Sequence, residues 1–192
     1  MLELLLASLL IMGSPGPATI SLTAAGSAYG LRRSLGYLAG IVVGTALVLL
    51  AVATGITAAL LAVPAMRPVL IGVSAAYILW LAYKVATAPA LVAGPATGSP
   101  SFGGGALLGV ANPKAWVAIA AVFASARLAG AAATDAAAKV ALLSGMIVVI
   151  NASWLLVGAS LAPALRDPRR ARVVNVVLAT ALVGAAALAV LR

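Results

Sequence analysis

Long apolar stretches, separated by short polar or Gly/Pro-rich breaks, dominate the chain. The apolar stretches cover approximately residues 2–28, 35–63, 69–86, 106–126, 137–165 and 173–191. An α-helix needs about 20 residues to cross about 30 Å of hydrocarbon, and each stretch is close to that length. The pattern therefore predicts an all-α integral membrane protein with about six transmembrane helices.

The two halves of the chain share one plan. We expect a first three-helix repeat at 1–88, a Pro-, Gly- and Ser-rich linker at 89–105 and a second three-helix repeat at 106–192. In each half a proline interrupts the leading segment, at Pro17 and at Pro113, half a chain length apart. An odd number of spans per repeat inserts the second copy upside down, as in many secondary transporters. The sequence therefore predicts a single transmembrane transporter domain made of two inverted three-helix repeats.

Composition supports a lipid environment and excludes several kinds of chemistry. The chain is 65% hydrophobic and 8% charged, whereas about a quarter of the residues of a soluble domain are charged. Its net charge of +9 comes from basic residues between apolar runs, which argues for membrane lipid and against nucleic acid as a partner. Cys and His are absent, so disulfides, thiolate nucleophiles and Cys/His metal sites are excluded. We expect no enzyme activity, no cofactor and no metal.

The distribution of Lys and Arg predicts an orientation in the membrane. These residues are more numerous in the loops after the first, third and fifth segments than in the loops after the second and fourth. The positive-inside rule then places the richer loops in the cytoplasm and both termini outside. This orientation reverses if one segment does not span.

The first apolar segment contains the most conspicuous break, Ser14-Pro15-Gly16-Pro17. Proline removes backbone donors and frees carbonyls, which must face protein or a water-filled cavity at membrane depth. One interpretation is a simple proline kink packed against a neighbour. The other is a substrate-binding break, because Ser14 and Thr19 add hydroxyls and the second half has its own break.

The second break, Asn112-Pro113-Lys114, places a charge near the middle of the fourth segment. A central Lys is penalised by about 2.5 to 3.5 kcal/mol on insertion scales, so it needs a partner. We expect carbonyls of the broken first helix or a substrate carboxylate; alternatively, Lys114 lies nearer an interface and snorkels. Asn112 is a neighbouring hydrogen-bonding group. Asn151, in the fifth segment, is a further candidate contact, although a buried amide often only links two helices.

Gly36, Gly40 and Gly44 form two overlapping small-xxx-small steps in the second segment. Such steps let another backbone approach closely, so we expect helix packing there. The partner is either internal or a second subunit, which leaves a homo-oligomer possible.

Several motifs together resemble the LysE/RhtB amino-acid exporter family. They are Ser14-Pro15-Gly16-Pro17, the residues GLRRSLG at 30–36, the Gly40 and Gly44 spacing, the residues AYILWLAYK at 76–84, and Asn112-Pro113-Lys114-Ala115. The resemblance covers nearly the whole length. It implies a six-segment, multi-pass protein of the bacterial inner membrane that exports amino acids or close derivatives, driven by the proton gradient. The signature breaks of the family fall on Pro15, Gly16, Pro17, Asn112, Pro113 and Lys114.

Two departures leave the substrate open. Many members carry a polar or His residue in the second helix, where this chain has Thr45 followed by an apolar run. Many also have a Phe-Leu-Pro-like end to the fourth helix, where this chain reads VFAS at 122–125. The sparse intramembrane charge favours a neutral amino acid as substrate.

The working hypothesis is alternating access around a site between the two breaks. Lys114 and a half-helix N-terminus would hold the substrate carboxylate, and carbonyls near Pro15 and Pro17 would hold its ammonium. Lys114, as the evident intramembrane titratable group, would also couple transport to protons. One rival is an ion or metal-cation channel or carrier of the wider exporter superfamily, although the segments lack the ligands that cations prefer. Others are an intramembrane enzyme, which would need a base or paired acids, and a non-transporting structural membrane subunit.

Overall fold

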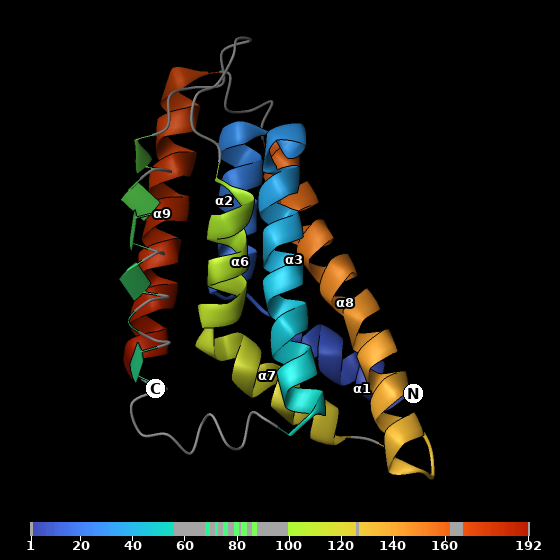
Figure 1. The fold of residues 1–192 in the computed structure, drawn as a ribbon. Coiled ribbons are helices and arrows are strands. Elements are labelled where there is room, and N and C mark those ends of the chain that lie inside the picture. The colour runs from blue at the N-terminus through green and yellow to red at the C-terminus, as the bar shows by residue number, and fades with distance from the viewer. Residues whose placement is uncertain are drawn as a thin grey trace.

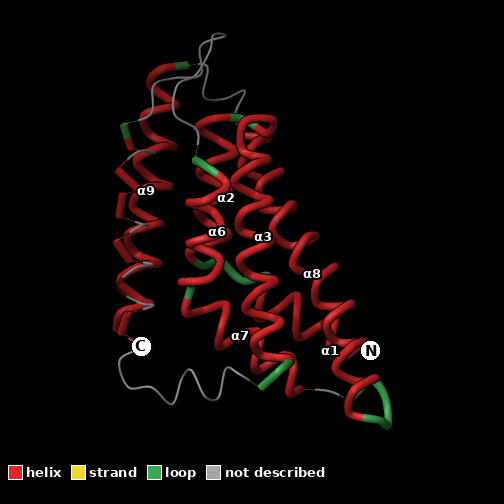
Figure 2. The backbone as a smooth tube through the Cα atoms, viewed as in Figure 1, coloured by secondary structure: helices red, strands yellow, loops and turns green. Residues whose placement is uncertain are grey.

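A computed structural model shows the chain as a set of helices packed side by side (Figure 1). It describes residues 2–55, 100–125, 127–161 and 167–191, and in addition residues 68, 69, 72, 75, 76, 79, 80, 82, 83, 86 and 87. Within this part of the chain all regular structure is helical, as Figure 2 shows.

The helices follow one another with short connections where the chain is described. In order, they are α1 (Leu2–Ala7), the π-helical segment η1 (Ser8–Met12), α2 (Pro17–Tyr29), α3 (Leu31–Ala53), α6 (Phe102–Ala111), α7 (Pro113–Ser125), α8 (Ala132–Leu161) and α9 (Pro168–Leu191). The described residues from 68 to 86 are helical as well and lie against α9 (Figure 1).

Two of these helices have the length and apolar character of membrane spans. They are α3 and α8, with mean hydropathies of 2.4 and 2.2 over their most apolar windows. Two bent pairs pass the same test jointly: α1 and η1 with α2, bent by 66°, and α6 with α7, bent by 59°. The described residues thus contain two clear spans and up to four. Among the described residues of α9, Arg172–Ala181 forms a shorter apolar helix. Most of the expected third segment lies outside the described residues.

Both bent pairs contain the same backbone step. Gly16 is extended, with φ −167° and ψ −179°, and Asn112 is also extended, with φ −68° and ψ 106°. Each precedes a proline, and a residue before proline avoids the helical region because it clashes with the proline ring. Pro17 and Pro113 then begin α2 and α7, where the missing N–H costs nothing. The chain therefore ends one helix and starts another, rather than kinking one helix.

A seam of glycines joins α3 to α6, which run side by side in Figure 1. A Cβ added to Gly40 would collide with the carbonyl of Phe102 and approach Ala106 N to 2.8 Å. A Cβ on Gly44 would collide with the carbonyl of Ala106 and lie 3.1 Å from Gly109 Cα. The close partner of this glycine face is therefore internal.

A second seam joins α2 to α8. A Cβ on Gly26 would lie 2.6 Å from the carbonyl oxygen of Leu155, and one on Gly158 would collide with the backbone of Thr23. The Thr23 hydroxyl also donates to the Trp154 carbonyl oxygen at 3.2 Å. Together the two seams pack the long helix of each half of the chain along a broken helix of the other half.

The glycines near the start of α3 differ from those in the seam. Gly30 is the only residue between α2 and α3, and its φ of +76° is a conformation that glycine adopts without a steric penalty. Gly36 is exposed, and a Cβ there would meet none of the described atoms within 4 Å. Among the described residues Gly36 therefore has no close packing partner, unlike Gly40 and Gly44.

Several boundaries differ from those expected. Residues 102–105, assigned to the linker 89–105, belong to α6, because Ser101 Oγ caps this helix by accepting from Gly104 N at 3.1 Å and Gly105 packs against α3. The helices α3, α8 and α9 start at Leu31, Ala132 and Pro168, earlier than the apolar runs, because their first turns include polar and charged residues. The expected end of the second segment, 56–63, and residues 89–99 of the linker lie outside the described residues.

Candidate functional site

Lys114 connects the two broken helices. It lies in the first turn of α7, and its Nζ donates hydrogen bonds to the carbonyl oxygens of Ser14 and of Pro15, the latter at 3.4 Å. Both carbonyls are in the break between η1 and α2, where no helix uses them. Of the partners expected for Lys114, the structure shows the carbonyls of the broken first helix.

The third carbonyl of this break has a partner on another helix. Trp154 of α8 donates from its indole Nε1 to the Gly13 carbonyl oxygen at 3.1 Å. Successive carbonyls at residues 13, 14 and 15 are thus bound by side chains of α8 and α7. This arrangement meets the requirement that exposed backbone at membrane depth be satisfied by protein.

Local hydrogen bonds stabilise both breaks. The N–H of Gly16 donates to Thr19 Oγ1 at 2.8 Å, and the Thr19 hydroxyl donates to the Gly16 carbonyl oxygen at 3.1 Å. In the second break, Asn112 Oδ1 accepts from the Lys114 N–H at 3.1 Å. Thr19 and Asn112 therefore fix the starts of α2 and α7, and the Asn112 bond fixes the backbone that carries the Lys114 side chain.

A small cavity of about 40 Å³ lies beside Lys114, enough for one or two water molecules. Its polar lining residues are Gly16, Thr19, Thr45, Asn112, Lys114 and Asn151. Its apolar lining residues are Met12, Ala18, Ala115, Ala118, Ile119, Ile147 and Ile150. The cavity thus collects polar groups from α2, α3, α7 and α8 within an apolar surround, an arrangement suited to binding a small polar ligand.

The predicted site residues have different relations to this cavity. Gly16, Thr19, Asn112, Lys114 and Asn151 line it. Ser14 and Pro15 contribute the carbonyls that bind Lys114, whereas Pro17 and Pro113 begin the following helices and are not among the lining residues. Asn151 Nδ2 donates at 2.8 Å to the carbonyl oxygen of Ile147 in its own helix.

Two residues that matter to this site were not predicted. Thr45 is buried and is the polar lining residue from α3; a hydroxyl within an apolar run was the signal. Trp154 lies one helical turn beyond Asn151 in α8, so the two share a face. An indole N–H on the face of a predicted site residue was a usable signal as well.

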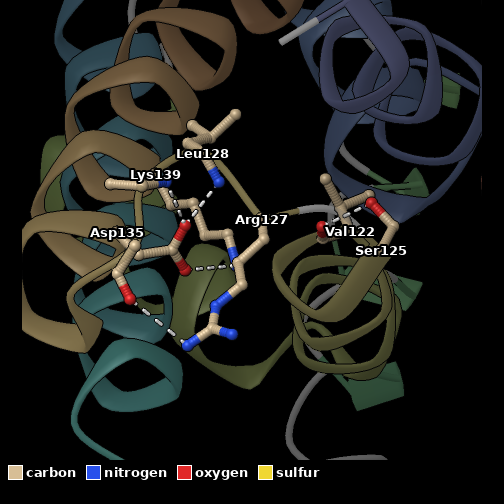
Figure 3. A network of polar contacts seen from close by, with 8 residues as sticks. Val122, Ser125, Arg127, Leu128, Asp135 and Lys139 are labelled. Carbon is tan, nitrogen blue, oxygen red and sulfur yellow. Dashed lines mark hydrogen bonds and ion pairs between the residues drawn. The ribbon is translucent and has the colours of Figure 1, made fainter.

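A separate polar network holds the connection from α7 to α8 (Figure 3). Asp135 forms an ion pair of 2.8 Å with Lys139, and its Oδ1 also accepts from the N–H groups of Leu128 and Ala129. Lys139 is buried in α8 with its Nζ 5.0 Å from the centre of the Phe123 ring. None of these residues lines the cavity.

The described residues contain no group of three or more His, Asp, Glu or Cys side chains able to hold a metal ion. What they do contain is an all-helical, apolar bundle with two interrupted helices, joined by a Lys at a polar cavity. Discontinuous helices around a polar site define a class of membrane transport proteins.

The comparisons with known proteins specify the family. The family model for LysE type translocators matches residues 9–192, so the chain belongs to this family. It is therefore a transport protein and not an enzyme.

Curated relatives share part of the sequence. A cysteine/O-acetylserine efflux protein of Salmonella typhimurium is 46% identical over 78 residues, which are 40% of each chain. Proteins with the same name are 38% identical over 46% of this chain and 42% of the relative in Klebsiella pneumoniae, and 37% identical over 53% and 52% in Escherichia coli. The chain thus spans about half or less of the length of the curated relatives it matches. No solved structure matches it.

Proposed function

We propose that the protein exports small neutral amino acids or close derivatives across the bacterial inner membrane. One observation carries this proposal: Lys114 joins the two broken helices beside a polar cavity, in a chain of the LysE type translocator family. The efflux proteins similar to this chain are named for cysteine and O-acetylserine. We take these two compounds as the first candidate substrates.

The lining of the cavity supports a substrate with one ammonium and one carboxylate. Lys114 supplies one positive charge, and Thr19, Thr45, Asn112 and Asn151 supply neutral polar groups. No described lining residue is acidic, so a second cation, such as a lysine side chain, would have no charged partner here.

We assign the two ends of the substrate to the two breaks. The carboxylate binds Lys114 at the N-terminus of α7, where the helix dipole also favours a negative charge. The ammonium binds carbonyls near Pro15 in the break before α2. Ser14, Gly16, Pro17, Thr19, Asn112, Pro113 and Asn151 shape or line this site.

Six spans arranged as two inverted repeats would let such a site open alternately to the two sides of the membrane. The element order supports this architecture, because each half has short helical segments on both sides of a proline break, followed by a long helix. The helices that follow the breaks, α2 and α7, have 13 residues each. In this scheme the proton gradient drives export and Lys114 is the group that couples it.

Transport into everted membrane vesicles tests the proposal. Radiolabelled L-cysteine, O-acetyl-L-serine and a panel of other amino acids are compared for wild type and Lys114→Met, with and without a protonophore. We expect selective uptake that the protonophore and the substitution both abolish. Transport of no amino acid by correctly folded protein would refute the exporter function, and uptake insensitive to the protonophore would refute proton coupling alone.

A further inference from the structure

Lys114 and the proposed substrate ammonium need the same acceptors. Lys114 Nζ donates to the carbonyl oxygens of Ser14 and Pro15, and these belong to the group of carbonyls that we assign to the ammonium of the substrate. Two ammonium groups on one pair of carbonyls would repel each other and divide the same lone pairs. The substrate and Lys114 therefore cannot both bind there.

We propose that substrate binding is an exchange, in which the substrate ammonium displaces Lys114 from the Ser14 and Pro15 carbonyls and the freed Lys114 binds the substrate carboxylate. This inference rests on the proposed function and deepens it. No covalent bond is made or broken, and every charge has a partner before and after the exchange. An α-amino acid carries the two groups that such an exchange requires, at a fixed short separation.

The surroundings of Lys114 suit a movable side chain. The side chain is half-buried beside the cavity, and in the described part of the chain its hydrogen-bond partners are backbone carbonyls rather than carboxylates. Gly16 leaves its path open, since a Cβ there would lie 2.6 Å from Lys114 Cδ. The Lys114 backbone, in contrast, is fixed by Asn112 Oδ1 at 3.1 Å, so the ammonium can move while the helix start stays in place.

The exchange predicts that a ligand lacking either charged group binds poorly. An amine without a carboxylate would displace Lys114 and give it no new partner. A carboxylate without an amine would attract Lys114 and leave the two carbonyls unbound, which is costly at membrane depth. If Lys114 were instead a permanent structural bridge, or if the two subsites were independent, removal of the Lys114 side chain would not strengthen the binding of an amine that lacks a carboxylate.

Three thiol compounds provide the test in purified protein reconstituted into nanodiscs under reducing conditions. They are L-cysteine, cysteamine, which lacks the carboxylate, and 3-mercaptopropionate, which lacks the amine. We expect wild type to bind each truncated compound at least about tenfold more weakly than L-cysteine. In Lys114→Met, cysteamine should gain at least about tenfold over wild type and bind as well as L-cysteine, because the carbonyls are free.

Trp154→Phe is the matched control. It removes another side-chain donor to this break, at Gly13, but leaves Lys114 in place, so the order of the three ligands should stay as in wild type. Lys114→Arg, which keeps the charge, should also keep cysteamine weak. A cysteamine gain in Trp154→Phe equal to that in Lys114→Met would overturn the exchange, because mere loosening of the break would then explain it.

The wild-type measurement alone separates the two proposals. If 3-mercaptopropionate binds wild type as tightly as L-cysteine while vesicles still transport L-cysteine, the exchange is wrong and the exporter function stands. If wild type neither binds nor transports L-cysteine or O-acetyl-L-serine, the substrate assignment fails and the exchange built on it fails too.

Discussion

Gly16 and Lys114, which come from different halves of the chain, occupy adjoining space: a Cβ on Gly16 would lie 2.6 Å from Lys114 Cδ and 3.1 Å from its Nζ. The absence of a side chain at Gly16 is what lets the Lys side chain reach the Ser14 carbonyl. The proline break and the intramembrane charge thus depend on each other.

Gly16→Ala should therefore displace Lys114 and destabilise the protein by about 1 to 3 kcal/mol, a usual cost of overpacking. Thermal unfolding in detergent would measure the change, and vesicle transport of L-cysteine should fall as well. Gly145→Ala is the matched control, because a Cβ at this exposed α8 glycine would meet none of the described atoms within 4 Å. Lys114→Ala removes Cδ, so Gly16→Ala should cost less stability in the Lys114→Ala background than in wild type, although transport stays lost. An equal cost in both backgrounds would show that the clash does not involve Lys114.

Substitution of a glycine in the α3–α6 seam should lower stability strongly, whereas substitution of a glycine of α3 outside the seam should lower it weakly. Gly44→Val forces side-chain atoms into the backbone of α6 at Ala106, so we expect a loss of about 1 to 3 kcal/mol or more. Gly36→Val, on an exposed position of the same helix, should cost less than about 1 kcal/mol. Melting temperatures in one detergent would compare the two, and equal losses would contradict the seam.

Trp154→Phe removes the donor to Gly13 O while keeping an aromatic ring. The unbound carbonyl should cost about 1 to 3 kcal/mol. We expect faster amide hydrogen exchange in the segment from Ser8 to Gly16, measured by mass spectrometry. Unchanged exchange there would mean that the indole does not hold the break, and a matched Trp116→Phe variant would show whether any lost indole bond has this effect.

The Asp135–Lys139 pair should contribute to stability and not to transport. Asp135→Asn leaves Lys139 without its counter-charge, so the free energy of unfolding should fall. The double variant Asp135→Asn/Lys139→Met should recover most of this loss. Transport per folded molecule should match wild type in both variants, since neither residue lines the cavity. A transport defect in the recovered double variant would give this network a role in the mechanism.

The chain contains no native Cys, which allows a direct test of the cavity. Ala118→Cys places one thiol in the cavity wall, and Val117→Cys places one on the neighbouring, 69% exposed position of α7. Labelling of Ala118→Cys by a water-soluble thiosulfonate reagent should slow when O-acetyl-L-serine is added. Labelling of Val117→Cys should not respond, and protection at both positions or at neither would refute binding in the cavity.

The sequence alone predicted the elements whose physical cause is local. The prolines at 17 and 113 predicted two interrupted helices, since proline cannot continue a helix hydrogen-bond ladder. The cost of Lys114 in lipid predicted that it needs a partner, with the carbonyls of the broken first helix as one of the candidates. The Gly40 and Gly44 spacing predicted a close helix contact.

What the sequence did not predict depends on contacts between distant segments. Gly105 was assigned to the linker because the neighbouring sequence gives no sign that α3 packs against it. The burial of Lys139 was not predicted, because Asp135 neutralises its charge only once both residues lie in one helix. The sequence does not distinguish Trp154 from the apolar residues around it. Its role depends on the hydrogen bond from its indole to the Gly13 carbonyl, which lies in the break between η1 and α2.

The reciprocal packing of the two seams determines the order of biogenesis. Each seam joins a helix of the first half to a helix of the second, because α3 meets α6 and α2 meets α8. Neither seam can therefore form within one half alone. During synthesis the glycine face of α3 has no α6 to pack against until the residues after Phe102 have been inserted. Until then its backbone faces lipid or the insertion machinery. A fragment that ends before Phe102 would therefore need a separately made second half to complete it.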